Sequence, residues 1–261
     1  FQTVQDLLKL IEEMGVSDKV LFPRPKTSYW IDGKMYRSEI SPSAMFLPLP
    51  FFSKMRFGSA GVFIKLTPDW KSLEKVTANE WLLKYMGEDA YGKFFRPLLI
   101  GKFGAEYHKV NMAWMWARVK ARSLRLGTFE GGFQAFMDTL AKQLEAKGVT
   151  IHLETSIQGI TTQDGKPALA VNGETQVFDR VLATTSPGLL LKLAPELRET
   201  DFGKNIASLH SIGAVCVVIA IKQQLMTDGT YWLNLPAKSA DKNANPFPFL
   251  ALVEHTNWMD K

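Results

Sequence analysis

The residues best placed for chemistry in this sequence are the paired glycines Gly131-Gly132, which stand directly before a helical pattern at 134–147. Because glycine has no Cβ, such a pair lets a ligand or another chain segment approach the backbone closely. The first N–H groups of a helix lack intrahelical partners, and the helix dipole is positive at that end. The stretch therefore predicts a binding turn. A structural role at the helix start explains the neighbouring Glu130 as well as a catalytic role does.

Other side chains that commonly do chemistry are scattered along the chain. The four histidines show no metal-ligand spacing, so we expect no metal site. The single cysteine, Cys216, excludes a disulfide framework and fits a reducing compartment. Because it lies inside the apolar run 212–221, we expect it to be a small buried hydrophobe.

The charge balance is mildly basic, with a formal net charge of +5 at pH 7. No aromatic-plus-basic recognition module accompanies this charge, so no nucleic-acid partner is expected. Between His108 and Phe129 the chain has no acidic residue, and Arg118, Arg122 and Arg125 recur there at helical spacing. A solvated basic face is the preferred interpretation, and peripheral contact with anionic lipid headgroups is the alternative.

The elements that must position the paired glycines follow in the order helix, strand, meander and strand. Apolar residues from Phe133 to Leu144 recur at the spacing of a helix, and the alternation over 149–153 predicts a half-buried strand. Three short strands are expected next, joined by turns at Asp164-Gly165 and Asn172-Gly173; they are 157–162, 168–171 and 175–178. A last strand at 181–184 enters a loop at Ser186-Pro187.

The flanking segments predict further helices and strands. Thr3 resembles the cap of a first helix, Asp32-Gly33 marks a hairpin, and Thr77 with Glu80 forms a capping box. Helices are expected at 54–66 and at 106–124, and a further helix should begin at the capping box. Strands are expected at 247–253 and at 212–221, the latter covered on both faces.

These elements indicate a mixed α+β and α/β fold in which the chain leaves one domain and returns to it. We assign 1–125 to a first domain with a helical insertion, 126–190 to the middle of a second domain, and 191–261 to a return into the first. Such an arrangement commonly places a small-molecule cleft between two domains. No stretch reaches the roughly 20 apolar residues that a membrane span needs.

Four motifs in this order resemble the flavin-containing amine oxidase superfamily, in particular its protoporphyrinogen oxidase and phytoene desaturase branch. They are Tyr29 to Lys34 (YWIDGK), Gly127 to Phe133 (GTFEGGF), Gly148 to Ile160 (GVTIHLETSIQGI) and Asp179 to Pro187 (DRVLATTSP). The resemblance implies a Rossmann-like FAD domain joined to a substrate domain of mixed sheet and helices. It also implies an oxidoreductase in which hydride passes from the substrate to the flavin.

The resemblance also assigns roles to residues. It places Gly131 and Gly132 close to FAD, lets the backbone at Ile157 face the adenine ring, and brings the loop Thr184-Thr185-Ser186 near the dinucleotide. It implies that these spots converge on one surface. The dinucleotide signature G-x-G-x-x-G and the closing FAD segment are absent from the sequence. The chain therefore looks like a central fragment, which we expect to bind FAD weakly or not at all and to be inactive alone.

The substrate expected from the resemblance is a small apolar or cyclic molecule. Tyr29 and Trp30 are candidates to line its pocket, with hairpin packing as an equally good explanation, and Lys26 stands near the position where protoporphyrinogen oxidases often hold a propionate. With the strands aligned on Lys222, Cys216 occupies the position of the lysine of true amine oxidases. This argues against simple amine oxidation.

Two further hypotheses remain open. One is a non-enzymatic, membrane-peripheral binding module that uses the helix at 106–124. The other is a flavin-dependent nucleotide-sugar mutase. We expect a cytoplasmic location, with contact to the inner face of a membrane as the alternative.

Overall fold

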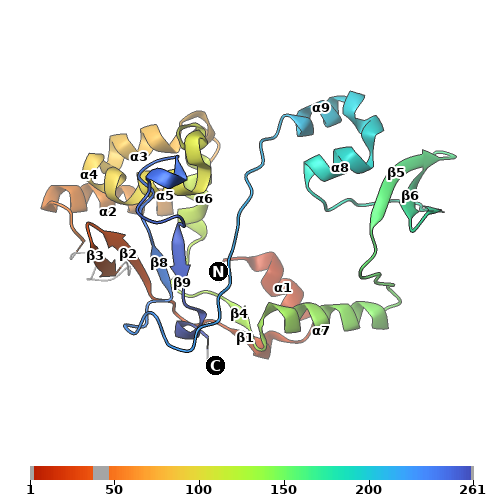
Figure 1. Ribbon diagram of the computed structural model, residues 1–261, viewed down its shortest axis with the longest axis horizontal. Helices are drawn as coiled ribbons and strands as arrows, with labels where there is room; N and C mark the ends of the chain where they lie inside the picture. Colours follow the sequence, from red (N-terminus) through yellow and green to blue (C-terminus); the bar gives the residue numbers. More distant parts are fainter. Residues whose placement is uncertain (1–2, 38–46, 260–261) are drawn as a thin grey trace. The chain divides into compact units, whose positions relative to one another are not determined.

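A computed structural model describes residues 3–37 and 47–259 of the chain (Figure 1). It divides into two compact units, the first formed by Phe1–Leu140 together with Val218–Lys261 and the second by Ala141–Val217. Both units mix helices with antiparallel strands, so the expected mixed fold class is confirmed.

The first unit is built on a four-stranded sheet in the order β3-β2-β8-β9. β2 (Thr27–Ile31) and β3 (Lys34–Arg37) form the expected hairpin, whose turn is made by Asp32 and Gly33, both at positive φ. β2 runs parallel to β8 (Trp232–Asn234), which pairs antiparallel with β9 (Ala251–Val253). The strand expected at 247–253 is therefore confirmed only over its last three residues.

A layer of helices covers one side of this sheet. It contains α2 (Phe51–Leu66), α3 (Ala78–Met86), α4 (Glu88–Ala90), a π-helical turn (Tyr91–Phe95), α5 (Arg96–Phe103) and α6 (Met112–Ala121). Their shared core is apolar and includes Leu82, Leu99 and Met112, each with no exposed surface. The capping box at the start of α3 is confirmed, since Thr77 accepts the backbone N–H of Glu80 and the Glu80 carboxylate accepts that of Thr77.

The ends of α2 and α6 are tied together by two lysines. Lys65 Nζ donates to the carbonyl oxygens of Lys120 and Arg122 at 3.1 and 2.6 Å. Lys120 Nζ donates in return to the carbonyls of Lys65 and Thr67 at 2.6 and 3.3 Å. A cation near the last carbonyls of a helix satisfies orphan acceptors and complements the dipole. Each lysine therefore caps the helix that carries the other.

The helix expected at 106–124 is shorter than predicted. A 3₁₀ segment covers Gly104–Lys109, the chain then extends, and Asn111 caps α6 by accepting the N–H of Trp114 at 3.0 Å. An asparagine side chain that accepts a backbone N–H two or three residues further along the chain favours a helix cap over a helix interior. This explains why α6 begins later than predicted. The buried residues of α6 are Met112 and Met115.

A second, smaller core of the first unit lies beside the paired glycines. α1 (Gln5–Glu13) and the start of α7 (Gly132–Ala146) pack around Ile11, Phe129 and Phe136. β1 (Val20–Leu21) pairs antiparallel with β4 (Thr128–Phe129). Thr3 does not cap α1, because its hydroxyl donates to the carbonyl of Ala121 at 2.7 Å.

The second unit contains the predicted meander, which is confirmed. β5 (Ile157–Gln163), β6 (Lys166–Val171) and β7 (Glu174–Val177) pair in sequence order. Both turns carry the positive φ that Asp-Gly and Asn-Gly hairpins require. α8 (Pro187–Leu193) packs on β5, and α9 (Asp201–Ala207) packs on α8. Isolated 3₁₀ turns elsewhere cover Ser17–Lys19, Ser72–Lys75, Pro195–Glu199, Lys242–Ala244 and His255–Asn257.

Three predicted strands are absent. The segments 149–153, 181–184 and 212–221 run without strand structure, and their apolar side chains are largely exposed, as at Leu182 (89%) and Val215 (93%). Cys216 is accordingly exposed and not buried. The physical reason is pairing: a strand needs a neighbour that satisfies its N–H and C=O groups, and no strand of the described residues lies against these three segments.

Candidate functional site

The paired glycines form the turn between β4 and α7. Gly131 and Gly132 have φ of +78° and +81°, a region that other residue types adopt only with strain. A Cβ on Gly131 would lie 3.0 Å from that of Ala135, whereas a Cβ on Gly132 would meet no atom within 4 Å. The backbone at Gly132 is thus open, and the first N–H groups of α7 lie beside it.

Glu130 holds this turn to the preceding structure. Its backbone N–H donates to the carbonyl of Lys19 at 2.8 Å, which continues the β1–β4 pairing by one residue. Its side chain is exposed. Either role proposed for its carboxylate stays a prediction.

The other predicted cofactor residues belong to the second unit. Ile157 is half-buried at the start of β5, where a bulge shifts the register before Gly159. Thr184, Thr185 and Ser186 are exposed in the loop that leads into α8, and Ser186 caps that helix through the N–H of Leu189 at 3.4 Å. The structure places Ile157 and this loop in one unit and the paired glycines in the other. A common surface for all of them stays a prediction.

The predicted substrate residues lie on or beside β2. Tyr29 is partly buried and meets Phe94 edge-on with ring centroids 5.3 Å apart, where it packs against the core of the helical layer. Trp30 meets Phe247 edge-on at 6.4 Å and belongs to a different core cluster. Successive side chains of a strand point to opposite faces, so a substrate on one face of the sheet would contact at most one of the two rings.

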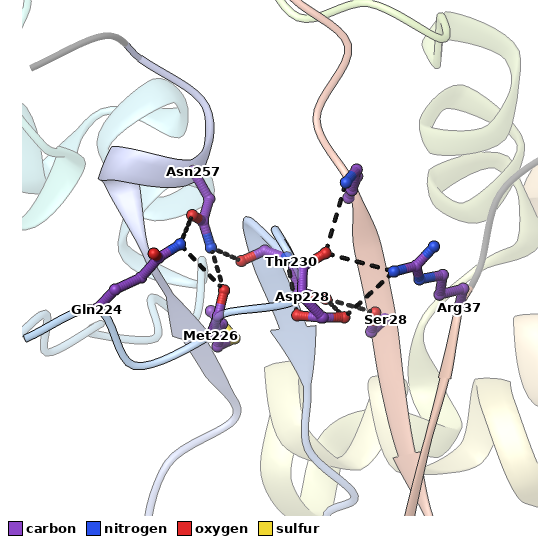
Figure 2. A network of polar contacts seen from close by, with 8 residues as sticks. Ser28, Arg37, Gln224, Met226, Asp228, Thr230 and Asn257 are labelled. Atoms are coloured by element: carbon purple, nitrogen blue, oxygen red, sulfur yellow. Dashed lines mark hydrogen bonds and ion pairs between the residues drawn. The ribbon is translucent and has the colours of Figure 1, made fainter.

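A polar network holds the turn before β8 against β2 (Figure 2). The Asp228 carboxylate accepts the backbone N–H and the hydroxyl of Thr230 at 3.0 and 2.8 Å and lies 3.8 Å from the Arg37 guanidinium. The Thr230 hydroxyl also lies 2.9 Å from that of Ser28, and both residues are fully buried. Lys26 Nζ donates to the backbone carbonyl of Asp228 at 3.4 Å.

Asp228 acts in this network as a charged group. Burial is the largest single influence on its pKa and would raise it. The hydrogen bonds from Thr230 and the charge of Arg37 outweigh burial, and together they bring the pKa of Asp228 below its ordinary value. The carboxylate is therefore ionised at neutral pH.

The same network continues to the polar run Glu254 to Asn257, which follows β9. The Asn257 amide donates to the carbonyls of Met226 and Thr230 at 2.8 and 2.7 Å, and Gln224 donates to the Asn257 side-chain oxygen at 2.6 Å. The Glu254 carboxylate accepts the N–H groups of Leu225 and Met226. These side chains organise the turn that precedes β8. The sequence patterns did not point to Gln224 or Asp228, although Asp228-Gly229 is the kind of pair that signals a turn.

The three predicted docking arginines do not share a helix face. Arg118 lies in α6 with its guanidinium 5.4 Å from the ring centroid of Trp114, whereas Arg122 follows the last residue of that helix. Arg125 lies beyond α6 and donates to the carbonyl of Phe22 at 2.9 Å. The helical spacing expected of them is therefore wrong, because α6 ends at Ala121.

Two other features are absent from the described residues: a cluster of metal ligands and a membrane-spanning helix. Within 3–37 and 47–259, no group of three or more His, Cys, Asp or Glu side chains is placed to hold a metal ion. In the same ranges, each helix is too short or too polar to cross a bilayer.

Comparison with known proteins places these features in context. The family model of flavin-containing amine oxidoreductases matches residues 1–253. A candidate protoporphyrinogen oxidase from Exiguobacterium sp. 255-15 superposes with a TM-score of 0.63 at 16% identity, over 97% of this chain and 60% of that protein. An oxidoreductase from Methanosarcina mazei gives 0.58 at 16% identity, over 78% and 50%. Cyclohexylamine oxidase from Brevibacterium oxydans IH-35A gives 0.52 at 12% identity, over 79% and 49%.

These likenesses concern the fold, since the identities are low. The chain spans about half to three fifths of the length of the solved structures that it matches. No curated protein matches it.

Proposed function

Because the chain belongs to the family of flavin-containing amine oxidoreductases, we propose that the protein is an FAD-dependent oxidoreductase that moves hydride from an apolar or cyclic substrate to the flavin. Membership in this family implies a flavin cofactor. The observation that carries the proposal is the family match over residues 1–253, which contains the open glycine turn before α7. The nucleotide-sugar mutase and the non-enzymatic module are not favoured by this match.

The residues at the glycine turn fit a dinucleotide. With no Cβ at Gly131 or Gly132, a cofactor can lie against the backbone, and the N–H groups of the first turn of α7 are oriented for an anionic group such as a phosphate. Gly132 has open space where a side chain would stand. Flavin supplies the hydride acceptor when bound, and the protein supplies binding and orientation.

We assign the remaining cofactor contacts to the second unit. Ile157 would offer backbone groups, because the bulge beside it interrupts regular pairing with β6. The loop Thr184-Thr185-Ser186 is exposed and carries three hydroxyls that can donate or accept hydrogen bonds.

For the substrate we assign Tyr29 or Trp30 as the apolar wall and Lys26 as a cation beside it. The Lys26 ammonium rests on the carbonyl of Asp228, so one of its three donors is occupied and its charge is not neutralised through this contact. A substrate with a carboxylate side arm fits this arrangement. The cyclic substrate class rests on the resemblance to the protoporphyrinogen oxidase branch.

The cofactor is tested with the protein at its native length. The purified protein should carry one flavin per chain, and denaturation should release FAD with its own mass. Gly132→Val should lower FAD affinity about tenfold or more, because a branched side chain at positive φ would shift the turn and occupy its open side.

Gly148→Val is the matched control for this experiment. Gly148 has φ of +87°, and its Cβ would also meet no atom within 4 Å, but it lies at the other end of α7. Equal loss of FAD in both variants would mean that backbone strain, and not the glycine turn, explains the effect. A protein that releases no flavin would overturn the proposal.

The substrate class is tested by anaerobic flavin reduction. Cyclic apolar compounds with a carboxylate side arm should bleach the flavin absorbance, and Lys26→Met should raise the concentration needed without changing the limiting rate. Faster bleaching by simple primary amines would contradict the proposed substrate class and leave the cofactor assignment intact.

A further inference from the structure

The turn after β9 brings three ring side chains together at the edge of the sheet. Tyr231 directly precedes β8, His255 begins the 3₁₀ turn after β9, and Trp258 follows that turn. The ring centroid of Tyr231 lies 5.9 Å from that of His255 and 5.1 Å from that of Trp258. The centroids of His255 and Trp258 are 6.1 Å apart. Each ring therefore contacts the other two, and we call the three residues the aromatic cluster.

The polar atoms of the aromatic cluster have no hydrogen-bond partner among the described residues. The indole Nε1 of Trp258 is buried and unpaired. Neither the Tyr231 hydroxyl nor the ring nitrogens of His255 bond to a described residue. Tyr231 is only 9% exposed, and burial raises the pKa of its hydroxyl, which therefore keeps its proton at neutral pH. A buried N–H without an acceptor is unfavourable, so the cluster favours a ligand that supplies one.

The backbone around the aromatic cluster is fixed by neighbouring polar side chains. Glu254 and Asn257 hold the turn to the segment 224–230 through their side-chain hydrogen bonds. The Glu254 N–H also donates to the Tyr231 carbonyl at 2.9 Å. These contacts hold the rings in place before a ligand binds, which lowers the entropic cost of binding.

The aromatic cluster adjoins both parts of the proposed site in the first unit. The Tyr231 N–H donates to the carbonyl of Lys26 at 2.9 Å. Met259, which follows the turn, accepts the Thr128 hydroxyl through its sulfur at 3.8 Å. Thr128 begins β4, the strand that leads into Gly131-Gly132. The cluster thus contacts the residue assigned to the substrate and the strand before the cofactor turn.

We propose that the aromatic cluster binds the carboxylate of a cyclic apolar compound, with the Trp258 indole N–H and the Tyr231 hydroxyl as donors and His255 at the exposed side. An indole N–H can only donate, so the ligand atom that it faces must be an acceptor. A carboxylate accepts hydrogen bonds more strongly than a neutral oxygen does, and the rings supply apolar surface for the rest of the ligand. The inference rests on the proposed function, because it names the donors that receive the carboxylate arm of that substrate.

The composition of the aromatic cluster decides against a phosphate group as the ligand. No lysine or arginine belongs to the cluster. A phosphate group carries a charge of about −2 at neutral pH, and burying it without a cation would be costly. A carboxylate has only one charge, which two neutral donors and an imidazole can receive.

The experiment uses the protein at its native length, labelled with 15N at its tryptophans, and cyclohexanecarboxylate as the probe. The indole N–H resonance of Trp258, identified by its loss in Trp258→Phe, should shift downfield on titration because the hydrogen gains an acceptor. Trp258→Phe and Tyr231→Phe should each weaken binding about tenfold in calorimetric titration, which corresponds to one hydrogen bond to a charged acceptor. Without the probe, Trp258→Phe should not lower the urea midpoint, since it removes an unpaired buried donor.

Trp116→Phe is the matched control, because the Trp116 indole N–H already donates to the carbonyl of Thr67 at 2.9 Å. This variant should bind the probe as the wild type does. Cyclohexylamine should leave the Trp258 resonance in place, since its ammonium has no lone pair to accept a hydrogen bond. Equal weakening in Trp116→Phe, a Trp258 resonance that the carboxylate does not move, or an equal shift with inorganic phosphate would each overturn the proposal.

Failure of this site and failure of the proposed function give different results. A protein that carries FAD but whose Trp258 resonance does not respond to cyclohexanecarboxylate would overturn the site alone. A protein that releases no flavin, but in which the probe still shifts that resonance, would overturn the proposed function and support the site.

Discussion

Strand β2 and the segment 212–221 carry similar residues but differ completely in environment. Both are rich in the β-branched or aromatic residues that are typical of strands. β2 has β3 on one side and β8 on the other, and its Ser28 is fully buried. The segment 212–221 pairs with no strand of the described residues, and Val215 is 93% exposed. The difference teaches that residue type supplies a tendency, whereas a strand exists only where neighbours satisfy its backbone.

The largest expected difference in the free energy of unfolding is between a substitution in the helical core and one in the segment 212–221. Leu82→Ala should lower the free energy of unfolding by about 2–5 kcal/mol, because Leu82 has no exposed surface and the truncation leaves a cavity. Val215→Ala should change it by less than about 0.5 kcal/mol, since it removes an exposed side chain. Urea unfolding followed by tryptophan fluorescence measures both. Similar losses in the two variants would mean that 212–221 is packed in solution.

A smaller effect is expected in the polar network that positions β2. Asp228→Ala should destabilise the chain by about 1–3 kcal/mol, because the Thr230 N–H and hydroxyl lose a charged acceptor. Gln223→Ala is a control at an exposed position of the same unit and should change stability little. An Asp228→Ala chain as stable as the wild type would show that the turn before β8 holds β2 without this carboxylate.

The network also predicts a pH dependence. The pKa of Asp228 is lowered in the folded chain, so the folded state favours the ionised carboxyl more than the unfolded state does. Its contribution is complete above the unfolded value of about 3.9 and disappears as the pH falls through the folded value. Urea midpoints between pH 3 and 6 should therefore fall more steeply for the wild type than for Asp228→Ala. Parallel curves would contradict the lowered pKa.

Loss of the α3 cap should have a moderate effect of local origin. Thr77→Ala should cost about 1 kcal/mol, because the first turn of α3 loses the acceptor for the Glu80 N–H. Thr77→Ser retains that acceptor and should recover most of the stability. If both substitutions cost the same, packing of the threonine methyl would be the cause.

The smallest effect on stability, and the sharpest test of the unpaired segment, comes from Cys216. It is exposed, so a thiol reagent should modify it in the native chain at a rate within about tenfold of that in urea. The modification should leave the urea midpoint unchanged. Strong protection of the thiol would show that 212–221 is buried, as its sequence alone indicates.

Local signals in the sequence were enough for the turns and caps of both units. Asp164-Gly165, Asn172-Gly173 and the Thr77 capping box involve residues only a few positions apart, so their geometry follows from the residues themselves. The helix predicted at 54–66 is also confirmed, although it begins three residues earlier, at Phe51.

Distant partners explain most of the failures. Thr3 bonds to Ala121, which is distant in the sequence. The segments 149–153, 181–184 and 212–221 have no neighbouring strand among the described residues. Local residue spacing indicates neither a distant partner nor the lack of one. For the candidate site, the positive φ of the paired glycines agrees with the turn predicted there. The turn that contains Asp228 and Thr230 is far from β2 in the sequence. For example, 202 positions separate Ser28 of β2 from Thr230. Only the fold could bring these residues together.

The crossed lysine contacts between α2 and α6 make the stability of one helix end depend on the other. If the last turn of α2 frays, Lys65 withdraws its ammonium from α6, and fraying of α6 removes Lys120 from α2 in the same way. The two ends should therefore open as a single cooperative unit. Native-state hydrogen exchange should report one common opening free energy for the amides of both last turns, and different values would show that each end frays by itself.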